Sequence, residues 1–306
     1  MKQVIDFQPL DLARKKEYDR YLMHCGQRGC EYSTANLFLW GRQRAAFLQD
    51  NLVFFSQFNR KSVYPFPVGP GDKKAALDAV IRDAQERGIP CRLTSLTEQE
   101  CALLEELYPG DFRIHCDRDF YDYVYAIDDL ADLTGRKFQK KRNHIHRFWD
   151  AYPNCQAEVL DETRMPQVEE MVEQWYALRE QQDPKGDYHM EKAALKKALR
   201  HRQTLGMEGL VLVDGGEILA MTLGGPLSED TFDVNFEKAR PDAEGAYAAI
   251  NQEFARFLRN QYPRLRFLNR EDDMGLEGLR KAKLSYCPDH MVEKYWACRL
   301  EDGYDY

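Results

Sequence analysis

Three consecutive carboxylates, Glu271, Asp272 and Asp273, follow the apolar run LRFLN and are well suited to acid–base chemistry. A carboxylate can hold an ammonium group or take a proton from it, and positioned proton transfer is a common element of catalysis. We predict that Glu271 and Asp272 are catalytic. The alternative is that these acids cap a helix that begins near Leu276, and for Asp273 both interpretations stay open.

Glu237 and Asn235 lie two residues apart in TFDVNFEKA, which we predict to be a strand. Because side chains alternate along a strand, both could face one cleft while Lys238 points to the other side. We expect Glu237 to join the catalytic carboxylates and Asn235 to contact substrate, as should Asn269 at the end of LRFLN. The two strands should be neighbours that splay apart near Asn235 and Asn269.

A loop between these two strands, RPDAEG, leads into a predicted helix, AYAAINQEFARFLRN. The first N–H groups of a helix lack partners and favour a phosphate, pyrophosphate or carboxylate. Gly245, Ala246 and Tyr247 are therefore predicted to bind the donor of a transferred group. Asp242 and Glu244 act against this prediction, because their charges would repel a pyrophosphate.

The stretch from Arg136 to Arg147, RKFQKKRNHIHR, is strongly basic in an acidic chain. A solvated helix face at a domain junction would explain it. A groove for a polyanion, such as the 3′ end of a tRNA or a CoA phosphate, is the alternative. The short helix predicted from LEGLRKAKLSY is also basic. Its cations could neutralise a phosphate or an oxyanion, or they could simply be solvated. The cationic candidates for donor binding are Lys140, Lys141, Arg142, Arg280 and Lys283.

The composition is that of an ordinary globular protein, with 306 residues, 31% of them charged, and a net charge of −8. This acidic balance argues against bulk binding of nucleic acid, although a local basic patch could still act on a tRNA. No apolar run approaches the roughly 18 residues of a membrane span, and the N-terminus lacks a secretory signal, so we expect a cytoplasmic protein without a transmembrane segment. The eight cysteines show no paired spacing, which favours buried free thiols, and we expect no metal.

The order of predicted elements in the second half indicates an α/β fold with a mixed sheet. Helices at 165–181 and 190–204 precede three strands that end with TFDVNFEKA, and then come a helix, a strand, a short helix and a last strand, MVEKYWACRL. This is the element order of the GNAT acyltransferase fold. We predict that the candidate site lies in this half.

The first half could be a second copy of the same fold. It contains, within residues 34–58, a predicted turn and then paired strands around Asp50-Asn51, followed by a helix at 73–87, a strand, a capped helix at 97–107 and a closing strand. We expect no Gly-bearing loop from a strand into a helix in this half. The prediction is two tandem GNAT-like domains, residues 1–130 and 151–306, joined by a basic linker helix at 131–150.

Two segments, FYDYVYAIDDLADLTGRKFQKKRNHIHRF and LNREDDMGLEGLRKAKLSYCP, resemble a family of bacterial proteins related to the C-terminal catalytic domain of phosphatidylglycerol lysyltransferases. The resemblance covers nearly the whole chain and extends, more distantly, to the Fem-type aminoacyl transferases. It implies tandem GNAT domains that move an acyl or aminoacyl group from a carrier, CoA or aminoacyl-tRNA, to a small-molecule acceptor with an amine or a hydroxyl group.

Similarity to GNAT enzymes also implies roles for single residues. Many of these enzymes keep a tyrosine acid after the short helix, where Tyr286 lies here, although Tyr286 could simply be packed. Acceptor substrates often lie on the first helix, which here carries Arg179. Ordinary acetyl-CoA enzymes carry Arg/Gln-x-x-Gly-x-Gly/Ala at the pyrophosphate loop, whereas residues 242–247 are DAEGAY. This departure favours an aminoacyl-tRNA donor or a lost activity.

Two classes of function therefore stay open. The first is an acyl or aminoacyl transferase that uses residues 231–286, and the acidic cluster beside a cationic helix favours it. The second is a catalytically silent binding module for a small anionic or aminoacylated ligand, which the altered loop favours. The sequence does not indicate the oligomeric state.

Overall fold

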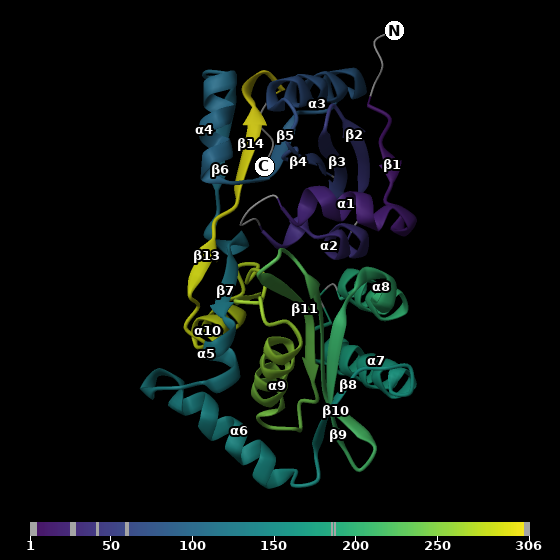
Figure 1. The fold of residues 1–306 in the computed structure, drawn as a ribbon, viewed down its shortest axis with the longest axis vertical. Helices are drawn as coiled ribbons and strands as arrows, with labels where there is room; N and C mark the ends of the chain where they lie inside the picture. Colours follow the sequence, from purple (N-terminus) through teal and green to yellow (C-terminus); the bar gives the residue numbers. More distant parts are fainter. Residues whose placement is uncertain are drawn as a thin grey trace. The chain divides into compact units, whose positions relative to one another are not determined.

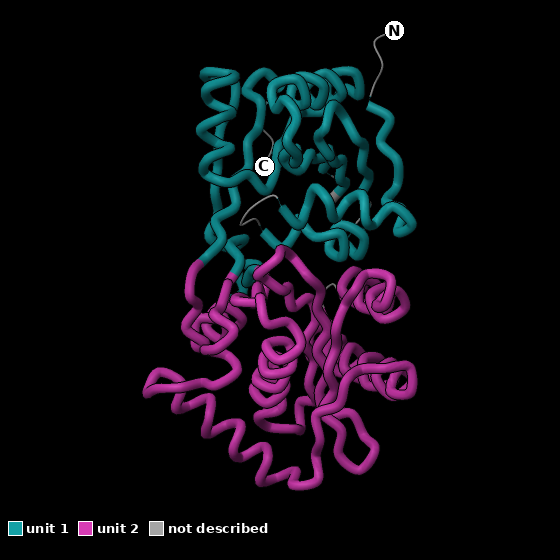
Figure 2. Tube along the Cα trace, viewed as in Figure 1, with its two compact units in different colours: residues 1–122, 272–276, 291–306 teal, residues 123–271, 277–290 magenta. Residues whose placement is uncertain are grey.

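The structure is a computed structural model that describes residues 5–24, 29–40, 43–58, 61–184, 186 and 188–302. The chain forms two compact units (Figure 2). Unit 1 contains residues 1–122, 272–276 and 291–306, and unit 2 contains residues 123–271 and 277–290. Each unit is built around one mixed sheet, so the class is α/β, as predicted from the element order.

The first sheet has the strand order β1-β2-β3-β4-β5-β14-β6 (Figure 1). Within it β4 and β5 run parallel, and each of the other neighbours is antiparallel. The bounds are β1 Gln8–Pro9, β2 Arg44–Leu48, β3 Asn51–Phe58, β4 Lys61–Pro65, β5 Arg92–Leu96, β14 Tyr295–Arg299 and β6 Phe112–Cys116.

Helices cover both faces of the first sheet. Alternate residues of β3 show this, because Val53 and Phe55 pack with α3 (Lys73–Arg87) and α4 (Glu98–Leu107), whereas Leu52 and Phe54 pack with α1 (Lys15–Leu22) and α2 (Thr34–Leu39). The predicted capping box of α4 is confirmed: Thr97 and Glu100 each accept from the other's backbone N–H.

The second sheet has the order β13-β7-β12-β11-β10-β9-β8, with β11 and β12 parallel. Its strands are β13 His290–Val292, β7 Asp122–Ala126, β12 Phe267–Asn269, β11 Thr231–Ala239, β10 Glu217–Pro226, β9 Glu208–Asp214 and β8 Gln156–Val159. Its helices are α5 Ile127–Asp132, α6 Gln139–Ala151, α7 Met165–Gln182, α8 His189–Leu205, α9 Ala246–Gln261 and α10 Glu277–Leu284. Short 3-10 turns span Leu12–Arg14, Cys30–Tyr32, Arg118–Phe120, Arg136–Phe138 and Leu300–Asp302.

Strand β11 shows that α9 lies on one face of the second sheet and α7 and α8 on the other. Glu237 contacts Asn251 of α9, whereas the next residue, Lys238, contacts Glu191 of α8 and Trp175 of α7. Lys238 therefore points away from Glu237, as the alternation predicts. Within the part of the chain that the structure describes, no helix is both long enough and apolar enough to cross a membrane.

Each sheet also takes a strand from the distant half of the sequence. β7 lies between β13 and β12 in the second sheet, and β14 lies between β5 and β6 in the first. The predicted last strand, MVEKYWACRL, therefore does not close the second sheet but divides into β13 and β14. The linear boundaries at residues 130 and 150 stay a prediction.

Two expectations for the first half are wrong. The predicted turn that opens the run from Thr34 is a helix, because the side chain of Ser33 accepts from Asn36 N–H and so caps α2, whereas the predicted paired strands around Asp50-Asn51 are confirmed as β2 and β3. A Gly-bearing loop also exists, since residues 66–72 lead from β4 into α3 and contain Gly69 and Gly71. The seven described cysteines are free thiols, four of them buried, and Cys25 lies outside the described residues.

Candidate functional site

The parallel strands β11 and β12 at the centre of the second sheet pair along only part of β11. β11 and β12 pair at Thr231 with Phe267, Phe232 with Leu268 and Asp233 with Asn269, and the register ends there. β11 continues to Ala239 without this neighbour. The prediction that the two strands are neighbours is confirmed, and their pairing ends at Asn269, where β12 ends; the splay near Asn235 and Asn269 stays a prediction.

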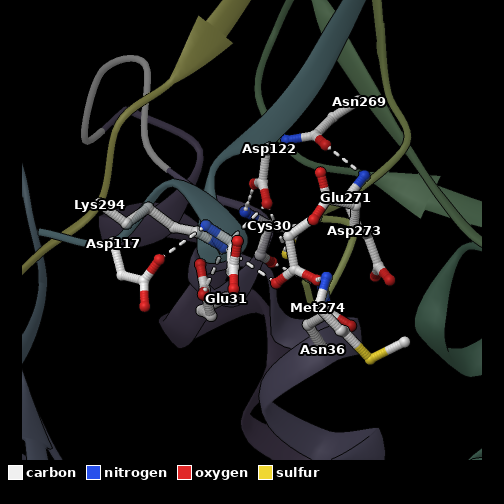
Figure 3. Close-up of polar contacts among 12 residues, drawn as sticks. Cys30, Glu31, Asn36, Asp117, Asp122, Asn269, Glu271, Asp273, Met274 and Lys294 are labelled. Carbon is white, nitrogen blue, oxygen red and sulfur yellow. Dashed lines mark hydrogen bonds and ion pairs between the residues drawn. The ribbon is translucent and has the colours of Figure 1, made fainter. Parts of the chain in front are cut away.

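A turn held by buried side chains follows β12. Glu271 has φ +57, a left-handed conformation that is costly for a non-glycine residue. Its N–H donates to Asn269 Oδ1 over 2.7 Å (Figure 3), and its carbonyl accepts from Lys283 Nζ over 3.1 Å. Lys283 also donates to the carbonyl of Arg270. Asn269 and Lys283 thus fix this turn, and Asn235 Nδ2 lies 3.4 Å from Glu271 Oε1.

Glu237 is the centre of a buried polar group in unit 2. Its Oε1 accepts from Arg270 Nη2 over 2.9 Å, and its Oε2 accepts from Asn251 Nδ2 over 3.2 Å. The side chains of Arg270 and Glu237 are 13% and 12% exposed. We call Glu237, Arg270, Asn251, Tyr286 and Lys141 the Glu237 cluster.

Two polar atoms of the Glu237 cluster are buried without a hydrogen-bond partner among the residues that the structure describes. They are Arg270 Nη1, a donor, and Asn251 Oδ1, an acceptor. An unsatisfied buried polar group costs about 1 to 3 kcal/mol, so evolution seldom leaves one without a ligand or water to bind. A ligand with a hydrogen-bond acceptor for Arg270 Nη1 and a donor for Asn251 Oδ1 would satisfy both atoms.

The ring of Tyr286 contacts both cations of the Glu237 cluster. The guanidinium carbon of Arg270 lies 4.9 Å from the ring centroid of Tyr286, and Lys141 Nζ lies 3.7 Å from the same centroid. Burial raises the pKa of Tyr286 to about 12, although Arg270 opposes this, so the hydroxyl stays protonated near neutrality. Burial and then Arg270 lower the pKa of Lys141 to about 8, although Glu237 acts in the opposite direction.

Helix α9 begins directly after Gly245, which has φ +87. No side chain of the described residues caps this N-terminus, but Ala246 N–H donates to Ala243 O over 3.1 Å and Ala248 N–H donates to Gly245 O over 3.0 Å, so the backbone already uses N–H groups that the sequence predicts to be free. Ala246 is buried, and Tyr247 is 40% exposed. A Cβ on Gly245 would lie 2.5 Å from His144 O of α6, so glycine lets α6 pack here.

The acids of this loop are less repulsive than the sequence suggests. Asp242 Oδ2 lies 2.7 Å from Arg240 Nη2, and Arg240 lowers the pKa of Asp242. Glu244 Oε1 lies 3.4 Å from Arg147 Nη1. Both negative charges are thus paired with a guanidinium group before any ligand arrives.

The cations of the basic stretch, residues 136–147, lie in different environments. Lys140 is exposed, whereas Lys141 turns toward Tyr286. Arg142 donates to the carbonyls of Leu133 and Gly135 and so holds the turn before α6. Only one of the three predicted donor-binding cations of this stretch therefore joins the Glu237 cluster.

The other predicted residues of unit 2 lie elsewhere. Arg179 is exposed on α7, with its guanidinium carbon 5.0 Å from the ring centroid of Trp175. Lys238 lies on that same face, 4.1 Å from the centroid of Trp175 and 2.5 Å from Glu191 Oε1. Arg280 is partly buried on α10.

Asp272 and Asp273 belong to unit 1, unlike Glu271. Asp273 is fully buried and accepts from Gly275 N–H at Oδ1 over 3.0 Å, so it holds the turn that precedes α10. Asp272 Oδ2 lies 3.7 Å from Lys294 Nζ.

Lys294 is the centre of a second buried cluster, in unit 1 (Figure 3). Its ammonium lies 2.8 Å from Glu31 and 2.8 Å from Asp122. Although burial opposes the charge, Asp122 and Glu31 raise the pKa of Lys294 well above its usual value. Cys30, Glu31 and Asp122 offer ligand atoms within 4.8 Å of one another, but the Lys294 ammonium already bonds to both acids.

Sequence analysis missed Arg270, Asn251 and Lys294. Arg270 directly follows Asn269, so the splay prediction already pointed to its position. Asn251 had a weaker signal, as one of two polar residues, with Gln252, on the mostly apolar buried side of α9. Lys294 had no signal, because its partners Glu31 and Asp122 lie far away in the sequence.

Comparison with known proteins gives one family. A model of the family "Phosphatidylglycerol lysyltransferase, C-terminal" matches residues 23–298. A conserved protein of unknown function from Bacteroides thetaiotaomicron has a structure with a TM-score of 0.90, at 37% identity, covering 96% of this chain and 99% of that one. L-PGS from Bacillus licheniformis has a TM-score of 0.70 at 15% identity, covering 97% and 94% of the two chains.

More distant structures confirm the tandem fold. FemX has a TM-score of 0.60 at 9% identity, covering 96% of this chain and 97% of that one. A tandem GNAT protein from the clavulanic acid biosynthesis pathway has a TM-score of 0.52 at 8% identity, covering 98% and 99%. An uncharacterized protein of Mycoplasmoides gallisepticum is 24% identical over 177 residues, and the chain spans about half the length of this curated relative, 54%.

Proposed function

Since the chain belongs to the family of phosphatidylglycerol lysyltransferase C-terminal domains, we propose that it is an aminoacyl transferase. In this proposal an aminoacyl group leaves the ester of an aminoacyl-tRNA and joins an amine or hydroxyl of a small-molecule acceptor. The reaction takes place at the splay between β11 and β12, beside the Glu237 cluster.

The observation that carries the proposal is the pair of unpartnered atoms in that cluster, Arg270 Nη1 and Asn251 Oδ1. When an acceptor attacks an ester, negative charge develops on the carbonyl oxygen, and a preorganised N–H donor stabilises it. Arg270 Nη1 supplies this donor. An aminoacyl ester also carries an α-ammonium group next to that carbonyl, and Asn251 Oδ1 with Glu237 offers acceptors for it.

The remaining side chains suit the departure of the carrier. Tyr286 keeps its proton near neutrality, because its pKa is raised to about 12, so its hydroxyl can protonate the leaving oxygen. Near the start of α9, Arg240 and Arg147 pair with the loop acids, which reduces the repulsion of these acids toward a phosphate of the carrier.

An aminoacyl donor is favoured over an acyl-CoA donor by the same contacts. An acetyl group has no ammonium, so it would leave Asn251 Oδ1 buried and unpaired. The loop at residues 242–247 also lacks the second glycine of ordinary acetyl-CoA enzymes. The activity after which the family is named further supports transfer of an aminoacyl group, with phosphatidylglycerol as one acceptor to test.

Thermal unfolding provides the first test. The protein would be heated with a 3′-aminoacylamino analogue of the aminoacyl-adenosine end of tRNA, with the matching deaminated analogue, and with acetyl-CoA. A ligand at 100 times its dissociation constant stabilises the folded state by about 2.7 kcal/mol, so the aminoacyl analogue should raise Tm. Stabilisation by acetyl-CoA alone would overturn the choice of donor.

A transfer assay separates an enzyme from a silent binding module. Aminoacyl-tRNA with radiolabelled amino acids would be incubated with the protein and hydroxylamine, a small general nucleophile, and in parallel with vesicles that contain phosphatidylglycerol. We expect protein-dependent loss of aminoacyl-tRNA with a new labelled product. Binding of the analogue without any product would leave the binding module as the function.

A further inference from the structure

Lys141 is the one cation of the Glu237 cluster that the proposed function does not yet use. Its Nζ lies 3.7 Å from the ring centroid of Tyr286, and its side chain is partly buried. No carboxylate of the described chain lies within ion-pair distance of this amine. Arg270, by contrast, shares the same ring and is paired with Glu237 over 2.9 Å.

From this geometry we propose that Lys141 acts as the base that takes the proton from the attacking acceptor at the Glu237 cluster. The inference rests on the proposed function and adds a residue to it. A partly buried amine that lies near a second cation and has no carboxylate partner binds its proton weakly, even though the aromatic face favours the charged form, whereas a lysine paired with an anion keeps its charge.

The titratable groups that face Lys141 come from three elements. Arg270, after β12, is a cation and disfavours a second charge nearby. Glu237 of β11 and Cys287, after α10, act in the opposite direction. With burial as the largest cause, the outcome is a pKa of about 8. A base with a pKa near the working pH is the most effective, because a useful fraction is already unprotonated.

The proton transfer balances as follows. The free Nζ of Lys141 takes a proton from the acceptor's ammonium or hydroxyl, which frees a lone pair on that nitrogen or oxygen. This lone pair forms a bond to the ester carbonyl carbon, and the carrier oxygen leaves with the electrons of the broken C–O bond. Tyr286 gives that oxygen a proton and regains one from Lys141 or from water.

Lys141→Arg separates a base from an anion-binding cation. Arginine keeps the positive charge but does not give up its proton at neutral pH. If Lys141 is the base, Lys141→Arg should bind the aminoacyl analogue within about 3-fold of the unchanged protein but transfer about 10² to 10⁴ times more slowly. The matched control is Lys137→Arg, because Lys137 is 50% exposed and already paired with Asp129.

The pH dependence gives a second readout. In the unchanged protein the rate with hydroxylamine should rise with pH through a midpoint near 8, and Lys141→Arg should lose this inflection. Competitive labelling with trace acetic anhydride measures the amines directly. Lys141 should label with a midpoint near pH 8, whereas Lys137, whose pKa is raised by its hydrogen bond to Asp129, should label only in more alkaline solution.

The outcomes distinguish this inference from the function beneath it. Transfer by the unchanged protein together with equal transfer and an unchanged pH profile in Lys141→Arg would falsify the role of Lys141 alone. Labelling of Lys141 only at strongly alkaline pH would do the same. Absence of transfer by the unchanged protein, despite binding of the analogue, would overturn the proposed function itself and the base with it.

Discussion

In the first sheet β4 runs parallel to β5, and α3 connects the two strands along the chain. In the second sheet β11 runs parallel to β12, and α9 connects them in the same way. Each of these strand–helix–strand units buries a carboxylate, Asp83 in the first and Glu237 in the second. Asp83 of α3 accepts from Tyr64 Oη over 2.8 Å, from Arg87 Nε over 2.6 Å and from Ile5 N–H over 3.0 Å. The Asp83 cluster is thus satisfied by the protein, whereas the Glu237 cluster keeps an unpartnered donor and acceptor among the described residues.

The loops before the two helices differ in the same way. Asp72 caps α3 by accepting from the N–H groups of Lys74 and Ala75, and Lys73 donates to Asn51 and to the carbonyl of Gly69. The loop before α9 ends in Gly245 without a side-chain cap among the described residues. The two units therefore differ in how the polar groups around one buried carboxylate are satisfied: those around Asp83 are paired within the protein, whereas Arg270 Nη1 and Asn251 Oδ1 beside Glu237 have no partner among the described residues.

Among the changes that compare the two sheets, the largest expected effect is on transfer, from Arg270→Lys. The ammonium keeps the charge beside Glu237 but cannot replace the second N–H of the guanidinium fork. Loss of one donor to the developing oxyanion should lower kcat by about 10²- to 10³-fold, while the dissociation constant of the aminoacyl analogue changes little. Steady-state kinetics with hydroxylamine check this.

The matched change in the other sheet is Arg87→Lys, which alters the same kind of fork beside Asp83. Arg87 lies in the satisfied cluster, so this variant should keep the transfer rate. Equal losses of kcat in both variants would show that the two clusters do not differ in function.

Asp83→Ala should produce the next largest effect, on stability alone. The substitution leaves the hydroxyl of Tyr64 and the N–H of Ile5 without their acceptor and breaks the pair with Arg87. The free energy of unfolding should fall by about 3 kcal/mol, measured by urea denaturation. The folded fraction should transfer at the normal rate, and a loss of kcat would move the site toward the first sheet.

Gly245→Ala should destabilise more than Gly88→Ala, although both glycines have positive φ. Alanine in this region costs about 1 to 2 kcal/mol at either site. At Gly88 a Cβ meets no atom within 4 Å, whereas at Gly245 it would lie 2.5 Å from His144 O. We expect losses of about 1 kcal/mol at Gly88 and about 2 kcal/mol or more at Gly245 by urea denaturation. Equal losses would mean that α6 adjusts easily.

Local signals in the sequence predicted much of the fold. The cap at Thr97, the glycine after Arg87 and the alternation in TFDVNFEKA act over a few residues, and each element formed where expected. That β11 and β12 are neighbours was also predictable, because element order implies which strands pair. The exchange of β7 and β14 between sheets was not, since it depends on pairing across most of the chain.

The candidate site was predictable only in part, for a related reason. Glu237, Tyr286 and Lys141 were named from the sequence, but Lys141 was expected to bind an anion. Its contact with Tyr286 joins residues far apart in the sequence, and its pKa depends on that burial. The three acids after LRFLN also looked equivalent, whereas the structure assigns Glu271 to unit 2 and Asp272 to unit 1.

The smallest expected effect is a pH-dependent gain of stability in Lys141→Met. The pKa of Lys141 falls from an ordinary value of 10.5 in the unfolded chain to about 8 in the folded one. Between these values the unfolded chain binds the extra proton, so the stability of the unchanged protein rises with pH from about 8 to 10.5.

Below about pH 8 both states carry this proton, and folding has the full cost of a partly buried charge. Methionine removes that cost, so Lys141→Met should be more stable than the unchanged protein by about 1 kcal/mol at pH 7, allowing for solvent screening, and the difference should vanish by about pH 10.5. Urea denaturation at several pH values measures it. Lys137→Met is the control with the opposite sign, since the hydrogen bond to Asp129 raises the pKa of Lys137 and stabilises its charged form. A gain in stability in the control equal to that in Lys141→Met would mean that methionine stabilises through added apolar surface. The charge of Lys141 beside Arg270 would then not destabilise the folded protein.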